Sequence, residues 1–283
     1  MATPAPIPTM ELADVGRTEL EIHDHGSGEP VVFIHTMRDE WYAVLAEPAL
    51  AERYRLVHYH RRGFGDSSTD GVPLSIAEHA ADCRAVLTHL GIERAHVAAL
   101  SGAGTIQLQL ALDFPEVVHS LAVLEPVLPV VTERFNQESS ELEDVLALAM
   151  PLLEAGRVAE GIDTLFRYLC GPTYREEFDR HLPAGWFDRI LTDWDTAAQH
   201  DFAAMNAWAF DAQDAARIAA PVLNLKGEHS TAEHQACHDA IRDWIPHAEN
   251  AVLPDTGHAM PQTNPTGTAE VLAGFFARHP MRS

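Results

Sequence analysis

Ser101 is the residue whose type and neighbours point most directly to chemistry. It follows an apolar run at 97–100, which predicts a short buried strand, and it precedes a helical pattern at 105–112. Its neighbours, among them Ala99 and Gly102, are small, as a strained turn between a strand and a helix requires. A hydroxyl at such a turn lies near the positive end of the helix dipole, which favours a developing anion. We therefore expect a nucleophile elbow with Ser101 at its apex, the alternative being a serine that only caps a buried helix.

Short apolar runs and helical patterns alternate along much of the chain. We expect further strands at 20–23, 30–35, 54–59, 120–124, 221–225 and 251–253. Helical spacing predicts helices at 76–90, 233–244 and 266–276. This alternation predicts a parallel sheet with helices on both faces, in which reacting groups gather at the carboxyl ends of the strands. The residues expected there are His35, His60, Ser101, Glu125 and His258.

The stretch 127–211 differs from the rest of the chain. It is helical in pattern and acidic, it lacks strand-like runs, and it carries Trp186, Trp194 and Trp208. We interpret it as an inserted helical lid. The predicted domains are a core of 1–126 and 212–283 and a lid of 127–211.

Composition excludes several partners. The 283 residues carry 19 basic and 42 acidic side chains, for a net charge of −23. Such a charge argues against nucleic acid and against an anionic membrane surface, and no apolar run reaches the length of a membrane span. The first ten residues lack the regions of a secretory signal, and the three cysteines are far apart. We therefore expect a cytoplasmic protein with reduced thiols.

A metal site is suggested only by His234 and His238, whose spacing of four places them on one helix face. A solvated helix rich in acidic residues and histidines explains the same spacing. We expect no metal and no cofactor. The pair Arg61 and Arg62 follows a predicted strand, and we interpret it as a salt-bridge group rather than a phosphate clamp.

Several strings together carry a resemblance to a known family. They are VVFIHT, YHRRGFGDSS, the stretch around Ser101, ALDFPEVVHSLAVLEP, PVLNLKGEHS and LPDTGHAMPQTNP. In order and spacing the chain resembles the α/β-hydrolase fold family from about Leu20 to Arg278. The resemblance implies an α/β fold, with a mostly parallel eight-stranded sheet and an inserted helical lid.

The chain departs from the family pattern at three places. The elbow reads Ala99-Leu100-Ser101-Gly102-Ala103, with alanines where the family has the outer glycines of G-x-S-x-G. His35-Thr36 stands where the family commonly has His-Gly, and His60 replaces an aspartate.

The resemblance also implies roles. His258 matches the family's base, which takes the proton of Ser101 and returns it to the leaving group. The usual acid position holds Ser230, which cannot serve, so we assign the acid to Glu125, where certain dehalogenases and zearalenone-type lactonases have theirs. Glu228 is the alternative acid, and Glu125 could instead be a structural carboxylate.

The same pattern assigns the oxyanion hole to the backbone N–H groups of Gly102 and Met37. Met37 merely lining the pocket is the alternative. For substrate binding we name Thr36 and Trp186, although the lid tryptophans could equally only pack the lid.

A serine nucleophile separates this chain from the dehalogenases and epoxide hydrolases of the fold, which use an aspartate. Ser101 therefore predicts acyl transfer on an ester, lactone, thioester or activated ketone. Our first hypothesis is a mid-sized, mostly apolar ester or lactone, with a natural-product lactone suggested by the lactonase resemblance. Two alternatives stay open: a tailoring acyltransferase, cyclase or lyase, and a non-catalytic ligand binder. The expected partner is a small-molecule ester or lactone, and a homodimer is left open.

Overall fold

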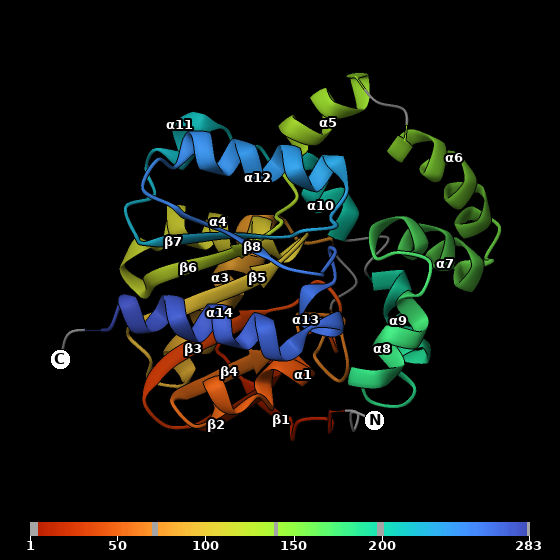
Figure 1. Ribbon diagram of the computed structural model, residues 1–283. Coiled ribbons are helices and arrows are strands. Elements are labelled where there is room, and N and C mark those ends of the chain that lie inside the picture. The colour runs from red at the N-terminus through yellow and green to blue at the C-terminus, as the bar shows by residue number, and fades with distance from the viewer. Residues whose placement is uncertain (1–4, 70–72, 139–140, 197–200, 282–283) are drawn as a thin grey trace.

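A computed structural model describes residues 5–69, 73–138, 141–196 and 201–281, and its centre is a sheet of eight strands (Figure 1). The strands are β1 (Glu11–Asp14), β2 (Glu19–Gly26), β3 (Glu29–Ile34), β4 (Tyr54–Tyr59), β5 (Ala95–Leu100), β6 (Val118–Leu124), β7 (Val222–Gly227) and β8 (Glu249–Leu253). Their order is β1-β2-β4-β3-β5-β6-β7-β8. Strand β2 pairs antiparallel with β1 and β4, and the other pairs are parallel. The predicted α/β fold with a mostly parallel eight-stranded sheet is confirmed.

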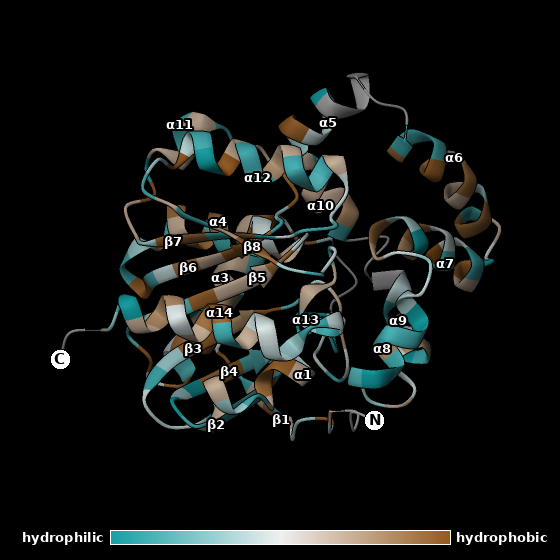
Figure 2. Cartoon of the chain, in the orientation of Figure 1, coloured by the Kyte–Doolittle hydropathy of each residue, from teal (hydrophilic) through white to brown (hydrophobic). Residues whose placement is uncertain are grey.

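Helices cover both faces of this sheet. One face packs against α1 (Tyr42–Leu45), α2 (Pro48–Ala51) and α14 (Pro265–Arg278). The other packs against α3 (Ile76–His89), α4 (Ala103–Asp113) and α12 (Ala232–Trp244). In β3, Val31 and Phe33 face the first layer while Val32 and Ile34 face the second. This burial on both sides explains why the central strands are continuous apolar runs, which appear brown in Figure 2.

Local signals set the ends of helix α3. The Ser75 hydroxyl accepts from the backbone N–H of Glu78, and the Glu78 carboxylate accepts from the Ser75 N–H, which forms a capping box. Gly91, with φ of +66°, follows the helix in a conformation that favours glycine. The predicted helix at 76–90 is therefore present almost as expected.

A helical segment connects β6 to β7. Its helices are α5 (Pro129–Glu138), α6 (Glu141–Glu154), α7 (Val158–Leu169), α8 (Tyr174–His181), α9 (Trp186–Thr196), α10 (Phe202–Ala207) and α11 (Ala212–Ala215). Helices α6 to α9 lie together beyond one end of the strands, on the right of Figure 1. Helices α7, α8 and α9 pack around a cluster of buried side chains, which also contains Ala259 of the core: Tyr174, Phe178, Leu182 and Trp186. This segment is the predicted lid, and its action as a lid stays a prediction.

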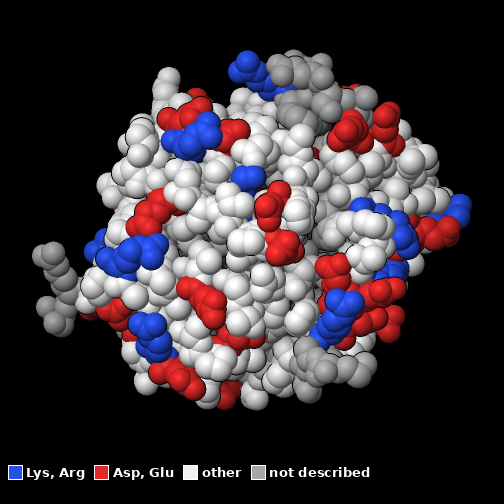
Figure 3. Space-filling model, in the orientation of Figure 1, with Lys and Arg blue, Asp and Glu red and all other residues white. Residues whose placement is uncertain are grey.

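Short elements complete the chain. The 3-10 turn η1 (Pro115–Val117) leads into β6, and α13 (Met260–Thr263) leads into α14. Within the described residues no helix combines the length and the apolar character needed to cross a bilayer. On the face shown in Figure 3, acidic side chains lie interspersed with basic ones rather than in a single patch.

Candidate active site

Ser101 lies at a strained turn between β5 and α4. Its φ is +57°, a left-handed conformation that L residues rarely adopt. Its N–H donates to Leu124 O at 3.0 Å, and its carbonyl accepts from the Gly104 N–H at 2.9 Å. A Cβ on Gly104 would lie 2.7 Å from Cβ of Pro126, so glycine is required where β6 leaves the sheet beside this turn. The side chain of Ser101 is half-buried at the carboxyl end of β5.

The Ala99 and Ala103 departures fit this geometry. Ala99 is fully buried, and Ala103 is 1% exposed at the start of α4. Both methyl groups belong to the core between the sheet and the α3–α4 layer. Alanine is therefore accommodated at both outer positions of the elbow.

Glu125 and His258 form a buried pair. Nδ1 of His258 lies 2.6 Å from Oε2 of Glu125, and their side chains are 7% and 0% exposed. The other carboxylate oxygen, Oε1, accepts the Gly227 N–H at 2.7 Å and the Ser230 hydroxyl. Burial by itself raises the pKa of Glu125, but the hydrogen bond and charge of His258, with further help from His234 and Ser230, outweigh it and lower the pKa to about 2.

The order of the strands brings these residues together. Ser101 follows β5, Glu125 follows the neighbouring strand β6, and His258 lies in the loop after β8, which β7 separates from β6. Glu125 also has a positive φ of +41°, so a second backbone distortion adjoins that of Ser101. At Gly227, an added Cβ would lie 2.4 Å from the Thr256 carbonyl, so glycine lets the histidine loop approach the end of β7.

Glu228 lies outside this arrangement. It is exposed, and its Oε2 accepts the Asp255 N–H at 3.0 Å. Ser230, which stands at the usual acid position, contacts Glu125 instead. Ser230 cannot act as the acid, but it supports Glu125, the carboxylate that we assign to that role.

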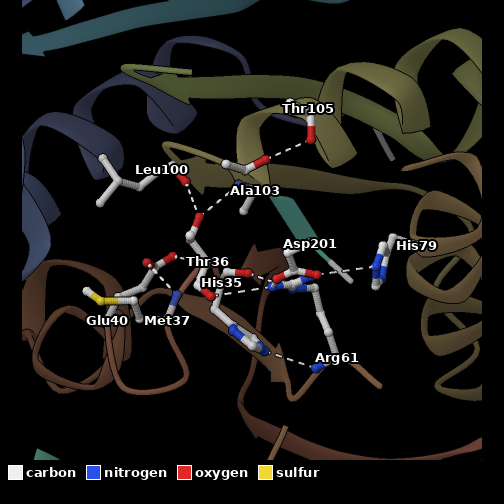
Figure 4. Close-up of polar contacts among 11 residues, drawn as sticks. His35, Thr36, Met37, Glu40, Arg61, His79, Leu100, Ala103, Thr105 and Asp201 are labelled. Carbon is white, nitrogen blue, oxygen red and sulfur yellow. Dashed lines mark hydrogen bonds and ion pairs between the residues drawn. The ribbon is translucent and has the colours of Figure 1, made fainter. Parts of the chain in front are cut away.

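The loop after β3 contacts the elbow through Thr36 (Figure 4). Its hydroxyl donates to Leu100 O and accepts the Ala103 N–H, each at 2.8 Å. A glycine at this position, as the family commonly has, could make neither bond. Thr36 is therefore fixed against the first turn of α4.

The N–H of Met37, a predicted oxyanion donor, is already engaged. It donates to Oε2 of Glu40 at 3.1 Å, and the N–H of Thr36 donates to Oε1 at 2.9 Å (Figure 4). Glu40 is 1% exposed. Burial raises its pKa to about 8, against the effect of the two backbone bonds and of the nearby Arg61.

Gly102, the other predicted donor, lies under helix α10. A Cβ on Gly102 would lie 2.7 Å from Sδ of Met205 and 3.4 Å from Cγ2 of Thr36. Met205 is 8% exposed, so this thioether covers the turn after Ser101. Glycine at 102 therefore makes room for the close approach of the helical segment.

The same segment is tied to the core by a buried ion pair. Arg61, in the loop after β4, donates to both carboxylate oxygens of Asp201, at 2.9 and 2.5 Å, and its Nε donates to His35 O at 2.8 Å. Asp201 is the residue that precedes α10. Arg62 pairs with Asp82 at 2.8 Å, so both arginines form salt bridges, as the sequence indicated.

Trp186 is 3% exposed, and its Nε1 donates to Asp179 at 2.7 Å. It shares with Met37 and Arg189 the lining of a cavity of about 10 Å³, which is too small for a substrate. The structure thus brings Trp186 close to the loop of Met37 and packs it within the lid cluster.

The structure separates His234 from His238, the two histidines whose spacing suggested a metal site. His234 stacks on His258 with ring centroids 3.8 Å apart and planes 16° apart, while Nδ1 of His238 lies 3.8 Å from Oδ1 of Asp239. Ligand atoms of Glu125, His234 and His258 lie within 4.8 Å of one another. Imidazole lone pairs lie in the ring plane, so nearly parallel rings do not converge on one ion unless they reorient. We therefore interpret the cluster as a stack and not as a metal centre.

Three contacts were missed by sequence reasoning: the Glu40 contact with Met37, the Arg61–Asp201 pair, and the stacking of His234 on His258. The spacing of Glu40 three residues after Met37 could have indicated a side chain capping the turn. The interpretation of His234 and His238 as part of a solvated helix is wrong, because both side chains are buried. The Arg61–Asp201 pair spans 140 residues and leaves no local signal.

Comparisons with known proteins agree with this architecture. A sequence model of the family described as alpha/beta hydrolase fold matches residues 29–265. The putative carbamate hydrolase RutD of Azorhizobium caulinodans is 36% identical over 118 residues, which cover 41% of this chain and 44% of that protein. The chain spans less than half the length of the first curated relatives it matches.

Longer matches also occur. The putative carbamate hydrolase RutD of Cronobacter turicensis is 26% identical over 247 residues, which cover 84% of this chain and 87% of that protein. Among solved structures, Est816, described as an N-acyl homoserine lactone degrading enzyme, is similar with a TM-score of 0.74 and 25% identity. That similarity covers 94% of this chain and 100% of the other.

Proposed function

The chain belongs to the α/β-hydrolase fold family, and from that premise we propose that it is a serine hydrolase of a mid-sized, mostly apolar ester or lactone. In this proposal Ser101 is the nucleophile, His258 the base and Glu125 the acid of a catalytic triad. The Gly102 and Met37 amides form the oxyanion hole. No metal or cofactor takes part.

The observation that carries the proposal is the 2.6 Å contact between Nδ1 of His258 and Glu125, beside the strained turn of Ser101. A buried carboxylate at Nδ1 fixes the tautomer that leaves Nε2 free to accept a proton, and it stabilises the imidazolium that forms. The low pKa of Glu125 keeps it ionised at neutral pH, as this role requires.

The reaction proceeds in two halves. His258 Nε2 removes the proton of Ser101 as Oγ attacks the substrate carbonyl, and the oxyanion forms against the Gly102 and Met37 N–H groups. His258 then protonates the leaving alcohol. Water, activated by the same nitrogen, releases the acid from the acyl-enzyme and restores Ser101.

The similarity to Est816 supports a lactone among the ester substrates, because that protein is described as degrading N-acyl homoserine lactones. The RutD relatives are described as putative carbamate hydrolases, whose substrate also has a carbonyl that a serine can attack. Fold does not set the substrate, so the two classes need a direct comparison.

One observation favours the second candidate, a non-hydrolytic tailoring enzyme or a ligand binder on the same fold. The N–H of Met37 donates to Glu40. A second oxyanion donor is available only when Glu40 releases that group.

Labelling with a fluorophosphonate probe tests the proposal. We expect a covalent adduct on Ser101 and hydrolysis of p-nitrophenyl esters, both lost in Ser101→Ala. Glu125→Gln should lower kcat by about 10⁴-fold, because the imidazole loses its partner. The matched control, Glu228→Gln, should leave kcat within about twofold of the wild type, since that side chain is exposed and away from His258.

Two outcomes contradict the proposal. Absence of labelling together with tight ligand binding favours the binder. Full activity in Glu125→Gln with loss of activity in Glu228→Gln overturns the choice of acid. Thermal unfolding of each variant shows whether a lost activity reflects a lost fold.

A further inference from the structure

His234 lies against the face of the proposed catalytic base. It comes from the first turn of α12, is 6% exposed, and stacks on His258 with ring centroids 3.8 Å apart and planes 16° apart. Its Nδ1 lies 3.9 Å from the same Oε2 of Glu125 that contacts His258. The proposed triad as assigned from the sequence gives this ring no role.

The hydrogen bonds of Thr231 hold the edge of the His234 ring. Thr231 is the residue that caps α12, and its Oγ1 accepts the backbone N–H of His234 at 3.5 Å. The same Oγ1 lies 2.7 Å from Nδ1 of the ring. The Thr231 hydroxyl therefore holds the Nδ1 edge of the ring by a short hydrogen bond, whichever of the two atoms donates.

The charges around the stack allow one cation and not two. Among the described residues, the charged or titratable groups near the two rings are Glu125 at the end of β6, Glu233 and Cys237 on α12, and Cys170 just after α7. Burial, and then the neighbouring His258, lower the pKa of His234 to about 3. A proton taken up during the reaction therefore belongs on His258, which alone holds the short contact to Glu125.

We propose that His234 is a positioning residue for the reaction, whose uncharged ring holds the face of the His258 imidazole while Glu125 holds its edge. This inference rests on the proposed function of Ser101 and His258. A hydrogen bond at Nδ1 alone lets the imidazole rotate about that bond. A flat partner at van der Waals distance removes that freedom and fixes the direction of Nε2 toward the nucleophile.

Two substitutions at one position separate stacking from hydrogen bonding. His234→Phe keeps a flat ring and loses the bond to Thr231, whereas His234→Gln keeps a polar group and loses the ring. We expect His234→Gln to lower kcat by about tenfold with KM little changed, because a misdirected base slows chemistry and not binding. His234→Phe should recover kcat to within about threefold of the wild type.

His238→Gln is the matched control. His238 lies one turn further along α12, is 5% exposed, and has no ring partner among the described residues. The substitution His238→Gln removes a buried imidazole from the same helix and leaves His258 and its contacts intact, so we expect kcat to stay near the wild-type value. The acid limb of the kcat/KM profile should keep its midpoint in His234→Phe, since His234 carries no proton in the reaction.

A measurement that needs no turnover keeps this inference separate from the proposed function. The proton between His258 Nδ1 and Glu125 should give a downfield NMR signal in the wild type and in His234→Phe, and a broadened or lost signal in His234→Gln. If the wild type neither labels nor hydrolyses, the proposed function fails while this signal still reports positioning. Equal loss in the Phe and Gln variants, no loss in Gln, or equal loss in His238→Gln overturns the role of His234.

Discussion

At the scale of single residues, a buried carboxylate lies where an oxyanion donor is expected. Glu40 accepts the N–H groups of both Thr36 and Met37. An ionised carboxylate there would compete with the oxyanion for the Met37 N–H and would repel its charge. Burial raises the pKa of Glu40 to about 8, so the group is mostly uncharged at neutral pH. A neutral acid is a weaker acceptor and repels far less.

This argument predicts an alkaline limit to activity. As pH rises through about 8, Glu40 ionises, and kcat/KM of ester hydrolysis should fall. Glu40→Gln cannot ionise, so its activity should stay level over the same range. Initial rates from pH 6 to 10 for both proteins provide the measurement. A wild-type profile that is level to pH 10, or the same fall in Glu40→Gln, contradicts this role for Glu40.

The sequence was informative at this scale where a residue's role follows from its neighbours in the chain. The small residues around Ser101 predicted the sharp turn, and φ of +57° confirms it. Thr36 was expected to contact substrate, yet its hydroxyl is engaged by Leu100 and Ala103. That contact joins the loop after β3 to the end of β5, and spacing along the chain gives no sign of it.

At the scale of elements, helix α10 is held over the elbow by the pair of Arg61 and Asp201. Both side chains are buried, and Met205 of α10 covers Gly102. His79 adds a contact to Asp201 at 3.6 Å (Figure 4). Two further pairs join the loop after β3 to α9: Arg38 with Asp193 at 3.0 Å and Arg189 with Asp39 at 2.5 Å. Buried ion pairs therefore add to the apolar contacts, such as those of Met205 and Trp208, that attach the inserted helices to the core.

Removing one partner of the buried pair should be costly. Asp201→Asn leaves the Arg61 guanidinium buried without a counter-charge, and we expect the free energy of unfolding to fall by about 3–5 kcal/mol. Unfolding in denaturant measures this free energy for the variant and the wild type. The control is Glu160→Gln, which removes a fully exposed partner of Arg157 and should leave the unfolding midpoint unchanged. Equal effects of the two substitutions would show that burial of the Arg61 pair is irrelevant.

Element boundaries were predictable where apolar runs are bounded by clear breaks. The strand at Tyr54–Tyr59 was predicted with its observed ends, because the mostly apolar stretch YRLVHY follows charged residues and precedes a glycine-rich loop. Strand β1 was not predicted. Its sequence, ELAD, has little apolar character, and it is a strand because β2 offers it an edge for pairing.

At the scale of the whole molecule, buried histidines outweigh surface charge in setting the response to acid. Among the described residues, six of the 17 histidines of the chain are buried with a pKa below the ordinary value, chiefly because of burial: His35, His58, His79, His96, His234 and His238. The net charge of −23 becomes less negative as pH falls, which relieves self-repulsion and would by itself raise stability. Four buried acids of the described residues have a raised pKa and act in the same stabilising direction: Glu40, Asp82, Asp193 and Glu233.

The histidines act in the opposite direction, and the sign follows from linkage. Their pKa in the folded state is below the unfolded value, so the unfolded chain takes up protons first as pH falls below about 6.5. Each such histidine should remove about 2 kcal/mol of stability by pH 5. Since histidines outnumber the raised acids, we expect the unfolding midpoint in guanidinium to fall steadily from pH 7 to 5. His58→Gln deletes one of these groups from β4. It should reduce the pH dependence of the free energy of unfolding by the equivalent of about one proton taken up on unfolding. A midpoint that stays constant or rises between pH 7 and 5 would mean that the buried imidazoles already carry their protons in the folded protein.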